Sequence, residues 1–381
     1  MTRLYSISPK PKERLSRLAL ILLCMAINIP LQHAQQKTEN VVLVTLDGLR
    51  WQEVFGGAVD SLMNDLKYVK DTDTLQLQQM FDASTPEERR KKLMPWLWSE
   101  VATTGQIYGN RWEGNSVRCS NSHWFSYPGY NEILTGFSDP NVTSNAKKYN
   151  ENMTVLEWIN NLPSYNGHVA AFASWDVFPY IINDQRSGIP VNAGFQKASG
   201  KRLSNMENIL NQLQDEIPSP WSSVRLDAFT HHFTMEYLKK EHPRVVYIAY
   251  GETDDFAHDG EYDHYLQSAH QTDSWLKDLW TFLQKDRFYR GKTTLIITTD
   301  HGRGESPKAE WQSHGKTYNG SPFIWLAALG PDTPALGEIK TEGRLFQNQI
   351  AKTLASFLGL DYTNEREEVG EVIETMFSGS H

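Results

Sequence analysis

The chain has 381 residues, of which 39% are hydrophobic and 22% charged, so it is long enough to bury a large core in one domain or two fused domains. Its formal net charge is −9, and no run of like charge suggests an interaction tail. This composition predicts a globular protein and argues against nucleic acid as a scaffold partner and against a charged interaction tail.

The first forty residues have the organisation of a targeting segment. Five basic residues between positions 3 and 17 precede the apolar run Leu18–Ile29. We interpret residues 1–34 as a secretory signal peptide, because the run is shorter than the roughly 20 residues that span a bilayer. The mature protein is then periplasmic or secreted, with no stable membrane span after cleavage; an uncleaved anchor, or a lipoprotein modified at Cys24, is the alternative. Without this segment Cys119 is the one cysteine left, so no internal disulfide is expected.

The rest of the chain alternates between apolar, β-branched runs and amphipathic segments. The apolar runs predict buried strands at 41–46, 167–174, 244–250, 295–299 and 321–328. The other segments predict helices at about 84–98, 126–136, 206–217, 224–240, 264–285 and 344–358. This alternation predicts an α/β fold, a doubly wound and mostly parallel sheet with helices on both faces. We assign residues 35–381 to a single catalytic domain with an insertion around 60–115.

Side chains that commonly bind metals follow three of the predicted strands, and one more lies in the loop after the last of these: Asp47, Asp254, His258, Asp300, His301 and His314. The carboxyl ends of parallel strands meet at one edge of a sheet, so we expect these side chains to converge. Asp254 and His258 are four residues apart, which puts both on one face of a helical turn. Oxygen and nitrogen donors together suit Zn or Mn better than Ca. Asp255 and Asp259, in the same acidic segment, are expected to be solvated.

Ser126 fits the N-cap of the short helix that ends at Gly136, with Pro128 in its first turn. At the positive end of a helix dipole a serine alkoxide and an incoming anion would both be stabilised. The alternative is that Ser126 only caps the helix. With Ser126 there are seven donors, enough for two ions with open positions. Two metals roughly 4 Å apart stabilise the attacking and leaving oxygens of an in-line displacement.

From Val41 to about Leu358 this order of motifs resembles the alkaline phosphatase superfamily, which includes nucleotide pyrophosphatase/phosphodiesterases and cofactor-independent phosphoglycerate mutases. The resemblance implies that Ser126 is the nucleophile and shares one metal with three residues, Asp47, Asp300 and His301. It implies that a second metal is held by Asp254, His258 and His314. The nucleophile pattern of the phosphodiesterases, Thr-aromatic-Pro with Thr-Gly nine and ten residues on, is similar to Ser126-Tyr127-Pro128 and Thr135-Gly136.

Two departures from the family pattern limit what the resemblance implies. Serine replaces the usual threonine, and Gly129-Tyr130 replaces the Asn-His of the phosphodiesterases, so their substrate class is not carried over. Sulfatases of the superfamily have an arginine four residues after the modified Cys or Ser, where this chain has Tyr130, and they rely mostly on oxygen ligands for Ca. A sulfatase is therefore not expected. For the family's Asn, Arg or Lys that binds phosphoryl oxygens, the candidates are Asn145, Lys147 and Arg50.

Together these features predict an exported two-metal hydrolase of phosphate mono- or diesters that acts through a phosphoserine at Ser126. The expected cofactors are two divalent ions, Zn or alternatively Mn, and the partner is a small phosphorylated substrate; the oligomeric state stays open. The alternatives are a phosphoglycerate mutase-like phosphomutase, a sulfatase-like esterase and a catalytically silent metal-binding protein of the cell envelope. Export argues against the mutase, and the intact Ser126 argues against the silent protein. Three tryptophans lie near the motifs: Trp51, Trp112 and Trp124. They are either core residues or a stacking surface for the leaving group.

Overall fold

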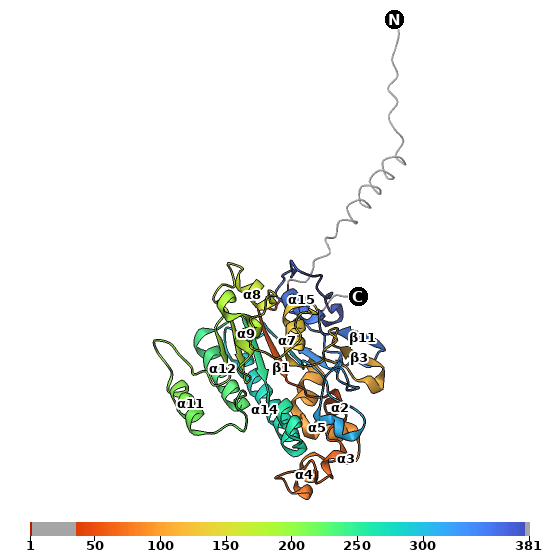
Figure 1. Ribbon diagram of the computed structural model, residues 1–381. Coiled ribbons are helices and arrows are strands. Elements are labelled where there is room, and N and C mark those ends of the chain that lie inside the picture. The colour runs from red at the N-terminus through yellow and green to blue at the C-terminus, as the bar shows by residue number, and fades with distance from the viewer. Residues whose placement is uncertain (2–35, 378–381) are drawn as a thin grey trace. The chain divides into compact units, whose positions relative to one another are not determined.

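The apolar runs form the strands at the centre of the structure (Figure 1). The computed structural model describes Met1 and residues 36–377, so the predicted signal peptide lies outside the described residues. In this part of the chain the main sheet has eight strands in the order β10-β2-β9-β7-β1-β6-β4-β5. Their bounds are Gly337–Glu338 (β10), Gln106–Tyr108 (β2), Leu326–Leu329 (β9), Thr293–Thr298 (β7), Asn40–Leu46 (β1), Val245–Tyr250 (β6), Val169–Ala173 (β4) and Val191–Ala193 (β5).

The five strands from β7 to β5 are parallel, whereas β9 is antiparallel to both β7 and β2. The register pairs Thr45 of β1 with Thr298 of β7, and Leu46 with Tyr250 of β6. The residues that follow these three strands therefore begin at the same edge of the sheet. This confirms the predicted mostly parallel α/β sheet.

Helices cover both faces of the sheet, because alternate residues of the buried strands point to opposite sides. On one side Val42, Val44 and Leu46 pack with residues of α2, α4, α5, α12 and α14; on the other, Val41 and Leu43 pack with α7, α8, α9 and α15 (Figure 1). The helices are Trp51–Gly56 (α2), Asp60–Met63 (α3), Thr74–Phe81 (α4), Pro86–Leu93 (α5), Ala102–Thr104 (α6), Ser126–Thr135 (α7), Val155–Asn160 (α8), Phe178–Ile182 (α9), Asp184–Ser187 (α10), Asn205–Glu216 (α11), Asp227–Glu241 (α12), Glu252–Asp259 (α13), Tyr262–Lys285 (α14) and Gln349–Phe357 (α15). No helix among the described residues is both long and apolar enough to cross a membrane.

The predicted helix at 84–98 is too long. Helix α5 ends at Leu93, just before Pro95, and a π-helical turn follows at Leu97–Val101. Proline favours an extended residue before it and cannot donate a backbone hydrogen bond. The backbone N–H groups of Trp96 and Leu97 donate instead to the carboxylate of Asp273 on α14, at 2.7 and 2.9 Å. Pro95 was therefore the local signal for the break, whereas the partner that accepts these two N–H groups is remote in sequence.

Two predictions near the C-terminus are also corrected. The predicted strand 321–328 is two strands, β8 (Phe323–Ile324) and β9, because the chain leaves one sheet and enters another at Trp325. Strand β8 belongs to a small second sheet with β3 (Asn115–Arg118) and β11 (Gly343–Phe346). The predicted helix 344–358 therefore begins only at Gln349, after β11.

The insertion predicted around 60–115 remains a prediction. This segment forms the short helices α3 to α6, the π-helical turn and β2, and β2 pairs with β9 in the main sheet. Short 3₁₀ helices also occur in the described chain, at Arg111–Glu113, Lys308–Gln312 and Glu374–Met376.

Candidate metal centre

The seven predicted donor side chains lie close together at the carboxyl edge of β1, β6 and β7. Around His301 the contacts are tight: its Nε2 is 3.4 Å from Oδ1 of Asp47, 3.4 Å from Oδ2 of Asp300 and 3.4 Å from Oγ of Ser126. The ligand atoms of the two aspartates and His301 all lie within 4.8 Å of one another. The structure thus unites residues that are separated by more than 250 positions in the sequence.

The other predicted donors adjoin this group. Nε2 of His258 lies 3.2 Å from Oδ2 of Asp254 and 2.9 Å from Nε2 of His314. The ring of His314 stacks on that of His301 with their centroids 3.9 Å apart, and both Nε2 atoms are 3.8 Å from Oδ1 of Asp254. As predicted, Asp254 and His258 are on one helix, α13. The ligand atoms of Asp254, His301 and His314 also lie within 4.8 Å of one another, so His301 adjoins both sets of possible ligands.

Two buried carboxylate oxygens in this group lack a hydrogen-bond donor among the described residues and could bind a cation. Oδ1 of Asp47 and Oδ2 of Asp300 are buried and have no hydrogen-bond donor among the described residues, and they are the oxygens that face Nε2 of His301. Buried oxygens without partners are costly, and a metal ion would satisfy them. The set of carboxylate and imidazole ligands is typical of zinc. These residues therefore fit the divalent ions that the sequence predicts.

Two histidines are held in the tautomer that a metal ligand needs. Nδ1 of His301 lies 2.9 Å from the carbonyl oxygen of Gly302, and Nδ1 of His314 lies 3.3 Å from that of Trp124. A carbonyl oxygen only accepts, so in each ring Nδ1 carries the proton and donates it. Nε2 then keeps its lone pair and points to the donor group, as in histidines that bind metals.

The charges in this group repel one another. Burial raises the pKa of Asp47 well above its usual range, and the carboxylate of Asp254 raises it further. Burial and the carboxylate of Asp47 likewise raise the pKa of Asp300. Burial also acts to raise the pKa of Asp254, but Arg303 and His258 outweigh it and lower this pKa well below the usual range. A divalent cation among these carboxylates would offset their repulsion.

Ser126 does not cap its helix, which corrects the N-cap prediction. It is the first residue of α7, while Phe125 holds the N-cap position in an extended conformation and accepts no capping bond. The chain is turned into the helix by Asn121, whose Oδ1 accepts from the backbone N–H groups of His123 and Trp124, both at 2.9 Å. The Ser126 hydroxyl is thereby left facing His301 instead of the end of the helix.

Sequence reasoning missed residues that contact the donor group. The hydroxyl of Tyr130 donates to Oδ2 of Asp47 at 2.8 Å, and Arg303 forms an ion pair with Asp254. Gly129 lets α7 approach Asp300, because a Cβ at this position would lie 2.4 Å from the Asp300 carbonyl oxygen. The four-residue spacing of Ser126 and Tyr130 was a usable signal, because residues at this spacing lie on the same face of a helix.

The three candidates for binding phosphoryl oxygens differ in what surrounds them. Arg50 is buried in an ion pair with Glu53 and also donates to the Gly304 carbonyl oxygen at 3.3 Å, so its donors are used within the protein. Asn145 is exposed, and its Oδ1 accepts from the backbone N–H of Tyr127 at 3.0 Å, next to Ser126. Lys147 is also exposed and pairs with Asp176 at 2.6 Å.

The sequence predicts that Asp255 and Asp259 are both solvated, but the structure confirms this only for Asp259. Asp259 is exposed and accepts from the indole N–H of Trp221 at 2.9 Å. Asp255 is instead partly buried, and burial, followed by the charges of Asp254 and Asp47, raises its pKa to about 9. Helix α13 packs against α14 and the 3₁₀ helix Lys308–Gln312, and this tertiary packing is not evident from the local sequence.

The three tryptophans near the motifs lie in different environments. Trp51 is buried and contacts Trp112 with a centroid distance of 4.5 Å, whereas Trp112 is 60% exposed. Trp124 is half-buried and contributes the carbonyl oxygen that accepts from His314. Trp51 is therefore a core residue, while Trp112 presents much of its surface to solvent.

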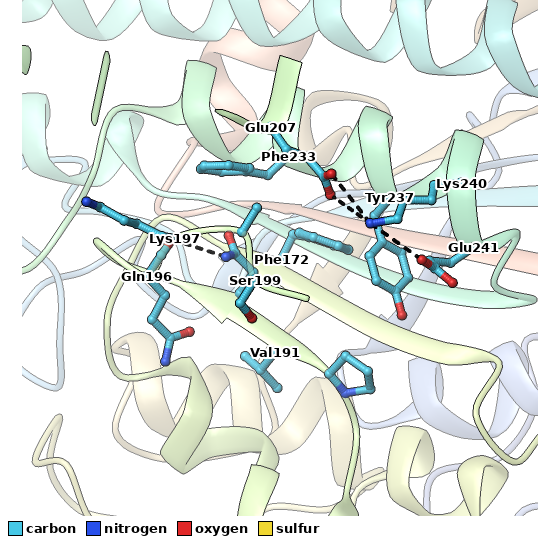
Figure 2. Close-up of a pocket in the computed structure, with 13 residues that line it drawn as sticks. Phe172, Val191, Gln196, Lys197, Ser199, Glu207, Phe233, Tyr237, Lys240 and Glu241 are labelled. Carbon is cyan, nitrogen blue, oxygen red and sulfur yellow. Dashed lines mark hydrogen bonds and ion pairs between the residues drawn. The ribbon is translucent and has the colours of Figure 1, made fainter. Parts of the chain in front are cut away.

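A cavity of about 430 Å³ lies away from these donors, among β4, β5, α11 and α12 (Figure 2). Phe172, Phe233 and Tyr237 line it, and at its edge Nζ of Lys240 is 3.4 Å from Oε1 of Glu207. None of the seven predicted donors is among its lining residues. The candidate metal centre and this cavity are thus separate features.

Comparisons with known proteins reveal the fold. No protein-family model matches the sequence, and no curated protein matches it. Among solved structures, alkaline phosphatase PafA is similar, with 11% identity, a TM-score of 0.56, and coverage of 90% of this chain and 99% of that one. The lipoteichoic acid synthase LtaP from Listeria monocytogenes has 11% identity, a TM-score of 0.55, and coverage of 87% and 74%. A 2-O GAG sulfatase has 12% identity, a TM-score of 0.52, and coverage of 89% and 74%.

At such low identities the likeness concerns the fold alone. The chain therefore has the alkaline phosphatase-like α/β fold that its sequence predicts.

Proposed function

We propose that this protein is a two-metal hydrolase of phosphate esters that forms a phosphoserine at Ser126. One observation carries the proposal: Oγ of Ser126 is 3.4 Å from Nε2 of His301, and that nitrogen is 3.4 Å from an unpaired buried oxygen of Asp47 and of Asp300. A hydroxyl beside such a set of ligands is where a metal-assisted nucleophile belongs. The fold shared with an alkaline phosphatase supports the same reaction class.

The two groups of donors have distinct roles in this proposal. Asp47, Asp300 and His301 would hold one ion next to Ser126, and a second ion would be held by Asp254, His258 and His314. When bound, the ions would supply Lewis-acid stabilisation of the negative charge on the attacking and leaving oxygens. The remaining chemistry belongs to the residues of the chain.

In the first step the proton of Ser126 passes to solvent, and its Oγ attacks phosphorus. The new bond joins Oγ to phosphorus, the bond from phosphorus to the substrate alcohol breaks, and the alcohol leaves with a proton from solvent. Because Ser126 is the first residue of α7, the positive end of this ten-residue helix faces the phosphoryl group and stabilises its negative charge. In the second step water attacks phosphorus, which releases phosphate, or a phosphomonoester from a diester, and restores the hydroxyl.

Asn145 and Lys147 are the proposed contacts to the phosphoryl oxygens. Asn145 already binds the backbone of Tyr127, so its amide nitrogen lies beside the nucleophile segment. Lys147 carries a positive charge in the same loop, although Asp176 partly neutralises it. We also propose that residues 1–34 direct export to the periplasm or to the exterior, which N-terminal sequencing of the exported protein would test.

The function is tested by assaying the purified protein, loaded with Zn²⁺ or Mn²⁺, with an aryl phosphate monoester, an aryl phosphate diester and an aryl sulfate. We expect release from a phosphate ester, loss of release in Ser126→Ala, and retention in Ser61→Ala, which alters an exposed serine in the first turn of α3. Acid quenching followed by mass spectrometry should find phosphate on the Ser126 peptide.

The alternatives predict other results in the same assay. Preferential release of sulfate would indicate the sulfatase-like esterase. The similarity in fold to a 2-O GAG sulfatase is the observation that keeps this alternative. A phosphoglycerate would be added to the panel, and its interconversion without release of phosphate would indicate a phosphomutase. Bound metal without any turnover would indicate the silent metal-binding protein.

A further inference from the structure

Arg303 is a buried cation that contacts both segments of the second group of donors. It follows His301 and Gly302 in the chain, and only 1% of its surface is exposed. Its Nη1 forms an ion pair with Oδ1 of Asp254 on α13. Its Nε donates to the carbonyl oxygen of Trp311 at 2.8 Å, and its Nη2 donates to that of Gln312. One guanidinium therefore binds a side chain and two backbone oxygens from separate parts of the sequence.

The backbone contacts fix the segment that carries His314. Trp311 and Gln312 end the 3₁₀ helix Lys308–Gln312, and His314 follows two residues later. The planar fork of a guanidinium holds several acceptors in one fixed arrangement. Arg303 thus sets the position of Asp254 relative to the chain that presents His314.

Gly48 makes this arrangement possible. A Cβ on Gly48 would lie 2.6 Å from Oδ1 of Asp254 and 2.7 Å from Nη1 of Arg303, closer than real contacts allow. Gly48 has a φ of +59°, a conformation that glycine adopts without strain. The turn after β1 therefore packs directly on the ion pair between Arg303 and Asp254 and limits its movement.

We propose that Arg303 is a positioning residue for the second ion, which holds Asp254 and the His314 segment at the spacing that the ion needs before it binds. The inference rests on the proposed function, because it assumes that Asp254, His258 and His314 bind an ion. The positive charge of Arg303 opposes a divalent ion, but three carboxylates surround the centre, those of Asp47, Asp254 and Asp300. Since they outnumber the guanidinium, the centre still attracts a cation.

The test compares zinc binding by the metal-free wild type, Arg303→Met and Arg303→Lys, using competition with a chromophoric chelator. We expect two zinc ions in the wild type. In Arg303→Met one ion should keep its affinity, whereas the other binds about 10- to 100-fold more weakly, as is usual when an outer partner of a ligand is lost. Arg303→Lys should be weakened similarly, because one ammonium group cannot hold three acceptors in a planar fork.

A matched control separates positioning from a general loss of stability. Arg90→Met removes another buried arginine, whose Nη1 and Nη2 donate to the carboxylate of Glu338 at 3.2 and 3.0 Å. We expect both ions to bind this variant normally. Thermal unfolding of the metal-free variants shows which of them fold. If Arg303→Met does not fold, Arg303→Lys provides the test.

The outcomes distinguish this inference from the function on which it rests. A wild type that binds no zinc would overturn both. Two ions bound with wild-type affinity in Arg303→Met, or in Arg303→Lys, would overturn only the role of Arg303. Equal weakening of both ions in the Arg303 variants would also overturn it, because a positioning role is selective for one site.

Discussion

Gly129 is a position where a single methyl group would disturb the proposed centre through the backbone. It lies on α7 against the backbone of Asp300, and a Cβ there would be 2.4 Å from the carbonyl oxygen and 3.0 Å from the carbonyl carbon of that residue. Ordinary contacts begin near 3.4 Å, so α7 and the Asp300 segment must separate by about 1 Å. Both sides of the contact are backbone, so no change of rotamer relieves it.

We expect Gly129→Ala to lower the free energy of unfolding by about 1–3 kcal/mol, which is the usual cost of overpacking a core. Ser126 is one turn earlier on the same helix, so it moves away from Asp300 with the helix. A displacement of about 1 Å at a reacting group lowers catalysis on the order of 100-fold. Calorimetry measures the first effect, and turnover of an aryl phosphate by the zinc-loaded protein measures the second.

Gly343→Ala is the matched control. The nearest atom to a Cβ at Gly343 is 3.7 Å away, and its backbone is not in the left-handed region, so neither stability nor turnover should change. The reasoning would be refuted if Gly129→Ala unfolded and turned over substrate like the wild type, since the close approach of α7 to Asp300 would then have no consequence.

Three other changes test the site and the core. Tyr130→Phe removes the hydroxyl that donates to Asp47, so we expect weaker zinc binding and a loss of about 1–3 kcal/mol in unfolding free energy, measured by titration and calorimetry; no change in either would contradict this contact. Burial lowers the pKa of His231 to about 3, so the neutral ring contributes to the free energy of unfolding above pH 6.5. This contribution, up to about 5 kcal/mol, is lost as the pH falls toward 3. His231→Gln should flatten this acid loss in urea titrations much more than His232→Gln, which alters an exposed neighbour; identical pH profiles would refute the assignment. A chelator should lower the melting temperature, because zinc at about 1,000 times its dissociation constant adds roughly 4 kcal/mol to the free energy of unfolding. A constant melting temperature would contradict a metal centre.

The main sheet and the convergence of the donors could be predicted because both depend on local patterns. Buried parallel strands are continuous apolar runs, and the residues after them meet at one edge whatever the order of the strands. Asp47 and Asp300 follow such runs directly, so their position required no knowledge of side-chain packing. The four-residue spacing of Asp254 and His258 likewise gave their common helix face.

The predictions that failed involved partners remote in sequence, although Pro95 was also a local signal for the helix break. The helix break after Leu93 is stabilised by Asp273, and the change of sheet at Trp325 coincides with an indole N–H that donates to the Leu49 carbonyl oxygen at 3.0 Å. Asp255 has the composition of a surface acid but is partly covered by tertiary packing. Local patterns contain no information about such contacts.

The departure from the phosphodiesterase pattern at Gly129-Tyr130 gains a physical explanation from these contacts. Gly129 admits the backbone of Asp300, and Tyr130 gives its hydroxyl to Asp47, so both residues serve the ligands of the proposed first ion. Tyr130 is also fully buried, which keeps its ring from a substrate. In the proposed function, substrate preference would depend on exposed side chains near Ser126, such as Asn145, whose Oδ1 accepts from the backbone N–H of Tyr127. In the proposed function Ser126 would therefore carry out the phosphoryl transfer, while Asn145 and Lys147 would contact the phosphoryl oxygens.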